Sequence, residues 1–96
     1  MSDFIERNFV KQVEFLKALV RVPSDNPPGD CAAHARSAKA LLEGFGFKVE
    51  AHKVPGDVVK KHGMASVINL VVRERFGPGP VVALNAHGDV VPPGQG

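Results

Sequence analysis

The sequence predicts a layered α/β fold in which two helices precede three strands. Apolar residues recur every three or four positions up to about residue 45, and this spacing is typical of amphipathic helices. From residue 47 onward the pattern changes to alternating or continuous apolar segments, rich in β-branched residues and separated by Gly and Pro. Helices followed by strands with short connections favour one layered α/β unit.

The first expected element is a helix over the first twenty residues. Pro23 cannot continue a helix and disfavours helical geometry at Val22, so we expect the helix to end at residue 20 or 21. Residues 24–29 favour turns and predict a loop. The apolar residues of the helix share one stripe: Phe4, Ile5, Phe9, Val13, Leu16, Leu19 and Val20.

A second helix is expected from Cys31 to about Phe45. Asp30 precedes it, where a carboxylate can accept hydrogen bonds from the free N–H groups of the first helical turn. Gly44 and Gly46 can adopt the left-handed geometry that ends a helix.

Three strands are expected after the helices. Residues 47–52 alternate between apolar and polar side chains, which predicts a half-exposed strand, and residues 55–63 predict a solvated loop. Residues 66–76 and 81–86 are joined through 77–80, and their apolar character is nearly continuous over 67–72 and 81–86. Such segments are typical of strands that are covered on both faces.

The last predicted strand needs a covering helix, and the residues after it do not supply one. We therefore expect the 96 residues to be the front part of a longer protein or a truncated form of it.

Composition excludes several classes of function. The chain has 12 Lys and Arg against 10 Asp and Glu, and their scatter along the sequence excludes a nucleic-acid-binding surface. Its longest apolar segments are far shorter than the ~20 residues of a membrane span, and the N-terminus lacks the pattern of a signal peptide. Cys31 is the single cysteine, which fits a reducing compartment. We expect a cytoplasmic protein without nucleic-acid or membrane partners.

The candidate chemistry lies at His87 and Asp89, directly after the last predicted strand. Ligands of open α/β sheets collect at the carboxyl ends of the strands. In extended backbone, residues i and i+2 project from the same face, so the two side chains can meet. Asp89 can then accept the N–H of one imidazole nitrogen and leave the other nitrogen free for a metal ion. Gly88 between them has no Cβ, so a substrate could approach the backbone closely there.

The remaining histidines and the cysteine have simpler explanations. We expect His34 to be a surface or boundary residue of the second helix, His52 to lie on the polar face of a strand, and His62 to lie in a solvated loop. Cys31 is expected to be a small packing residue, since Asp30 beside it disfavours a thiolate.

Residues 84–94 (LNAHGDVVPPG) resemble the first metal-binding segment of a zinc metallopeptidase family. This family includes acetylornithine deacetylase, succinyl-diaminopimelate desuccinylase, aminoacylase and glutamate carboxypeptidase, in which an apolar strand precedes His-x-Asp-Val-Val-Pro and a glycine. Residues 16–29 (LKALVRVPSDNPPG) are similar to the end of its first helix and the following turn, and residues 40–49 (ALLEGFGFKV) to its second helix and the next strand. The similarity covers most of the chain and is weakest over residues 55–64.

The resemblance implies that residues 1–96 are the incomplete N-terminal part of a layered α/β zinc-peptidase catalytic domain, without the inserted domain that mediates dimerisation in relatives. It implies that His87 is a zinc ligand and that Asp89 is the catalytic carboxylate that orients it. Family members hold two zinc ions, and cobalt or manganese can occupy such sites. Their further metal ligands and their general base lie downstream of this segment.

The implied activity is that of a metallopeptidase, amidohydrolase or deacetylase. It would hydrolyse an amide or peptide bond of a small N-acyl amino acid or a short peptide, and the complete protein would be a homodimer if it follows its relatives. The isolated 96 residues would be inactive, because a catalytic zinc usually needs three protein ligands. A second interpretation stays open: a non-catalytic α/β fragment or binding module, in which His-Gly-Asp only begins a loop.

Overall fold

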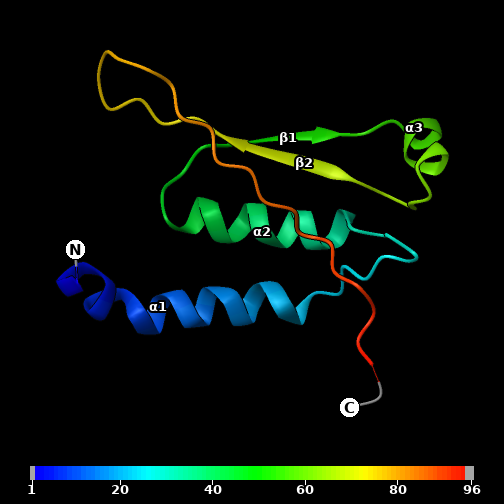
Figure 1. The fold of residues 1–96 in the computed structure, drawn as a ribbon, viewed down its shortest axis with the longest axis horizontal. Coiled ribbons are helices and arrows are strands. Elements are labelled where there is room, and N and C mark those ends of the chain that lie inside the picture. The colour runs from blue at the N-terminus through cyan, green and yellow to red at the C-terminus, as the bar shows by residue number, and fades with distance from the viewer. Residues whose placement is uncertain (1, 95–96) are drawn as a thin grey trace.

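The computed structural model describes residues 2–94, which combine helices with a small antiparallel sheet (Figure 1). This is consistent with part of an α/β fold. The elements, in chain order, are α1 (Ser2–Arg21), α2 (Ala32–Gly44), β1 (Val49–Lys53), α3 (Gly56–Lys61) and β2 (Ile68–Val72). Among the described residues, no helix is both long enough and apolar enough to cross a membrane.

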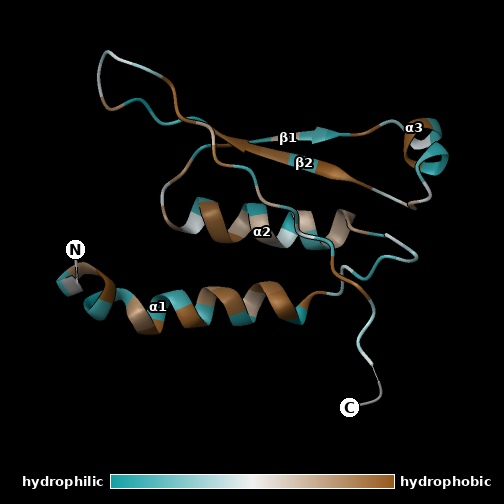
Figure 2. Ribbon diagram, in the orientation of Figure 1, coloured by the Kyte–Doolittle hydropathy of each residue, from teal (hydrophilic) through white to brown (hydrophobic). Residues whose placement is uncertain are grey.

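The elements form layers, with α2 between α1 and the sheet (Figure 1). Strands β1 and β2 pair antiparallel, in a register that runs from Val49 opposite Val72 to Lys53 opposite Ile68. The strand predicted over this segment is thus confirmed, with its start at Val49, but its burial does not alternate, because Ala51 is exposed while Glu50 is partly buried. Hydrophobic residues follow most of β2 and recur along α1 (Figure 2).

The two predicted helices are present, but the start of α2 differs from the prediction. Helix α1 ends at Arg21, as Pro23 predicts. At α2, the prediction that Asp30 caps the helix is wrong, because the backbone N–H of Ala32 donates to the hydroxyl of Ser66 over 3.0 Å. That hydroxyl in turn donates to the Asp30 carboxylate over 2.5 Å, so Asp30 supports the helix only through Ser66.

The turn between α1 and α2 needs a glycine at position 29. Gly29 has a φ of 71°, and a Cβ built there would lie 2.9 Å from Cγ and 3.0 Å from Cβ of Met64. Its N–H donates to the carbonyl of Asp25, and its own carbonyl accepts the N–H groups of Ala65 and Ser66. The turn is therefore tied to the residues that lead into β2.

Two sequence predictions about the later elements are wrong. Residues 56–61 form helix α3 instead of a loop, and Val59 packs inside with an exposed fraction of 3%. Residues 81–86 do not form a strand, and Leu84 is 95% exposed. A strand requires a hydrogen-bonding partner as well as β-branched residues, and no described segment pairs with these residues.

The core is small for a chain of this length. Among the described residues, the buried hydrophobic side chains are Ala35 and Val59. The accessible surface is 8018 Å², whereas a compact protein of this mass exposes about 5,300 Å². Many large apolar side chains in the stripe of α1 and in residues 76–91 are more than half exposed.

Candidate functional site

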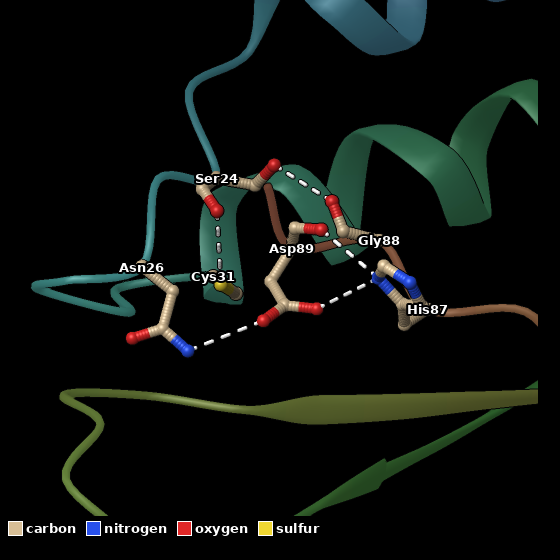
Figure 3. A network of polar contacts seen from close by, with 6 residues as sticks. All are labelled: Ser24, Asn26, Cys31, His87, Gly88 and Asp89. Atoms are coloured by element: carbon tan, nitrogen blue, oxygen red, sulfur yellow. Dashed lines mark hydrogen bonds and ion pairs between the residues drawn. The ribbon is translucent and has the colours of Figure 1, made fainter. Parts of the chain in front are cut away.

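The side chains of His87 and Asp89 meet, as the extended spacing predicts (Figure 3). Nδ1 of His87 lies 3.0 Å from Oδ1 of Asp89 and 3.0 Å from the backbone carbonyl oxygen of the same residue. Both oxygens are acceptors, so the neutral imidazole carries its proton on Nδ1. The lone pair of Nε2 is then free, on a side chain that is 86% exposed.

The backbone around this pair is held by the loop that follows α1, although residues 87–89 lie outside any regular strand. The N–H of Asn26 donates to the carbonyl of Val90 over 2.7 Å, and the N–H of Val90 donates to the carbonyl of Ser24 over 3.1 Å. The buried hydroxyl of Ser24 donates to the carbonyl of Gly88 over 2.7 Å. Three hydrogen bonds therefore fix the backbone of the candidate site.

Asp89 has a partner for each of its carboxylate oxygens. The side-chain amide of Asn26 donates to Oδ2 over 3.2 Å, while Oδ1 faces the ring of His87. The hydrogen bond from Asn26 is the largest cause that lowers the pKa of Asp89 below its ordinary value; it outweighs desolvation, which acts in the opposite direction, and the hydrogen bond with His87 lowers the pKa further. The carboxylate thus stays ionised and able to hold the imidazole N–H.

His34 lies next to the candidate site, a position that the sequence did not predict. A Cβ built on Gly88 would lie 3.0 Å from Cε1 and 3.2 Å from Nδ1 of His34, so the ring of this α2 residue lies directly against Gly88. The ring is partly buried, as expected for a boundary residue. Its place beside Gly88 depends on how the loop packs on α2, and no local pattern in the sequence indicates this.

Cys31 lies beside the same loop. Its thiol donates to the carbonyl of Ser24 over 3.8 Å (Figure 3). Burial, then the negative charges of Asp89 and Asp30, raise the pKa of this thiol. Cys31 therefore stays protonated, which fits a packing residue and not a nucleophile.

The other two histidines lie elsewhere. His52 is on β1, with Nε2 3.5 Å from a carboxylate oxygen of Glu50, and His62 follows α3 on the surface. Both are exposed, as expected. Within residues 2–94, no three His, Cys, Asp or Glu side chains are grouped so that they could hold a metal ion.

The donor set therefore fits one ligand position of a zinc site. A catalytic zinc takes three protein ligands and a water, and Nε2 of His87 is a suitable first ligand because Asp89 holds its other ring nitrogen. Comparisons with protein-family models, with curated proteins and with solved structures found no match to this chain.

Proposed function

We propose that this chain supplies the first metal-ligand segment of a zinc-dependent hydrolase. The hydrolase would cleave the amide or peptide bond of a small N-acyl amino acid or a short peptide. One observation carries the proposal: Nδ1 of His87 is engaged by Asp89 at 3.0 Å, which leaves Nε2 as an exposed ligand atom. The resemblance of residues 84–94 to a zinc metallopeptidase segment supports the reaction class.

The residues of this chain have separate tasks in that site. His87 presents Nε2, and Asp89 fixes the ring tautomer and raises the basicity of the ligand nitrogen. Ser24 and Asn26 hold the backbone on both sides of Asp89. A bound zinc ion lowers the pKa of a water molecule and stabilises the oxyanion that develops on the substrate carbonyl.

The other ligands have to come from residues outside the described part of this chain. Nε2 of His87 is a single donor, and two zinc ions would need several carboxylates to balance their charge. We therefore propose that residues 1–96 act as the N-terminal part of a larger catalytic domain. A further domain of the same protein would mediate the formation of a homodimer.

The test compares two histidines that each lie next to a carboxylate. In the complete natural protein, His87→Ala should remove zinc, as measured by metal analysis, and abolish hydrolysis of N-acyl amino acids. Asp89→Asn should weaken zinc binding by about 10–100-fold, because it takes away the carboxylate that orients the ligand. His52→Ala is the matched control, because His52 also lies beside a carboxylate but outside the site, and it should change neither measurement.

Unchanged zinc content in the His87→Ala variant would refute the proposal. That result would favour the second interpretation, in which His-Gly-Asp begins a loop of a non-catalytic module.

A further inference from the structure

We propose that Asn26 is a positioning residue for the pair formed by His87 and Asp89. Its side-chain amide holds one oxygen of the Asp89 carboxylate, so that the other oxygen is kept against the His87 ring. The consequence for metal binding rests on the proposed function, whereas the positioning itself is a property of this chain alone.

The carboxylate of Asp89 is engaged at both of its oxygens. A carboxylate that is engaged through one oxygen can still rotate about its Cβ–Cγ bond and break that contact. In Asp89, Oδ2 accepts from the amide of Asn26 at 3.2 Å while Oδ1 accepts from His87 at 3.0 Å. Because the two donors lie at opposite oxygens, the plane of the carboxylate is fixed (Figure 3).

Asn26 is itself held through its backbone, and its side chain has room beside Gly29. Its backbone N–H donates to the carbonyl of Val90, the residue directly after Asp89, over 2.7 Å. Its side-chain oxygen would lie 3.1 Å from a Cβ at Gly29, so the absence of a side chain there leaves room for the amide. The amide therefore has a fixed origin from which to orient Asp89.

Burial distinguishes the exposed ring of His87 from the two residues that orient it. Asn26 is partly buried, the Asp89 side chain is 34% exposed, and the His87 side chain is 86% exposed. An imidazole this exposed has little packing to limit its rotation, so its orientation depends on Asp89. The orientation of Asp89 in turn depends on Asn26.

An amide suits this role, whereas a carboxylate at position 26 would not. The Nδ2 group donates a hydrogen bond to the ionised Asp89, and hydrogen bonds to charged groups are stronger than neutral ones. In Asn26→Asp the shape is kept, but an acceptor replaces the donor and two negative charges face each other. In Asn26→Ala the donor is removed without an added charge.

The experiment measures the tautomer of His87 in the metal-free chain, at a pH at which the ring is neutral. Long-range ¹H–¹⁵N NMR spectra distinguish the Nδ1–H tautomer from the Nε2–H tautomer. We expect Nδ1–H to dominate in the wild type. Its ratio to Nε2–H should fall about fivefold in Asn26→Ala, which corresponds to about 1 kcal/mol, and further in Asn26→Asp.

Two controls show whether a change in the His87 tautomer ratio is specific to the site. Asn8→Ala removes an amide that donates to the carbonyl of Phe4 within α1, so it should leave the His87 ratio unchanged. The ring signals of His52, on β1, report on the fold and should stay the same in every variant.

An unchanged His87 ratio in both Asn26 variants would overturn the proposal, because Asp89 would then hold its orientation unaided. A change at His52 as well would also overturn it, because the effect would be a loss of fold and not of positioning. The tautomer is measured without metal, so this result is independent of the zinc test. Unchanged zinc content in His87→Ala would remove the proposed function and leave the role of Asn26 intact.

Discussion

Replacement of Gly29 by alanine tests whether the turn after α1 requires a glycine for two separate reasons. The first reason is the backbone, because a φ of 71° costs a residue with a Cβ about 1–2 kcal/mol. The second reason is space, since the added Cβ would lie 2.9 Å from Cγ and 3.0 Å from Cβ of Met64. The Met64 Cβ cannot move away unless its backbone moves, and that backbone donates to the carbonyl of Val59.

The expected cost of Gly29→Ala is therefore the sum of two terms. Steric overpacking at a tight contact adds about 1–3 kcal/mol, so the total loss in the free energy of unfolding is about 2–5 kcal/mol. A loss of this size is a large share of the stability of a small domain. The added Cβ would also lie 3.1 Å from the side-chain oxygen of Asn26, so the variant should also disturb the orientation of Asp89.

Substitutions at two other glycines distinguish the backbone cost from the steric cost. Gly46 has a φ of 92° but no atom within 4 Å of a built Cβ, so Gly46→Ala should lose about 1–2 kcal/mol from the backbone alone. Gly44 has neither constraint, and Gly44→Ala should be neutral or stabilising by up to about 1 kcal/mol. Urea unfolding, followed by the helical circular dichroism signal, gives the free energies. If Gly29→Ala costs no more than Gly46→Ala, the contact with Met64 does not constrain this turn.

Two further predictions concern α2 and the sheet. Ser66→Ala removes the acceptor for the N–H of Ala32, and we expect a loss of about 1 kcal/mol in urea unfolding, whereas the α2 control Ser37→Ala should cost less. The hydrogen bond from Arg73 lowers the pKa of Glu50, so its contribution to stability is full above the ordinary value of 4.5 and is lost as the pH falls through the folded value. Arg73→Gln should raise the Glu50 pKa in an NMR titration, and an unmoved value would contradict the assignment.

The parts of the fold that depend on local sequence were predictable. Pro23 determines where α1 ends, because the constraint acts on its own backbone and on the residue before it. The alternation after residue 47 likewise predicted β1, since one face of the strand is more polar than the other.

The parts that depend on distant partners were not predictable. Residues 81–86 have the composition of a buried strand, yet a strand forms only when another strand pairs with it. Helix α3 was missed because Pro55 and Gly56 look like turn residues, while the burial of Val59 depends on packing outside the segment. Asp30 was misassigned as a cap because Ser66, far along the chain, takes that position.

In the candidate site, too, local contacts were predictable and contacts between distant segments were not. The spacing of His87 and Asp89 predicted their contact, because residues two apart in extended backbone share a face. The contributions of Asn26 and His34 were not predicted, because they arise where the loop after α1 and helix α2 meet the end of the chain.

The exposed stretch between β2 and the site makes the candidate centre vulnerable to proteolytic nicking. Residues 76–86 are accessible and lie outside helix and strand, which are the properties that endoproteases favour. A single cut there would turn Gly88 and Asp89 into part of a separate peptide, held to Ser24 and Asn26 by a few hydrogen bonds. Because the covalent tether would be lost, only these hydrogen bonds would keep Gly88 and Asp89 beside Ser24 and Asn26, and the centre would come apart more readily.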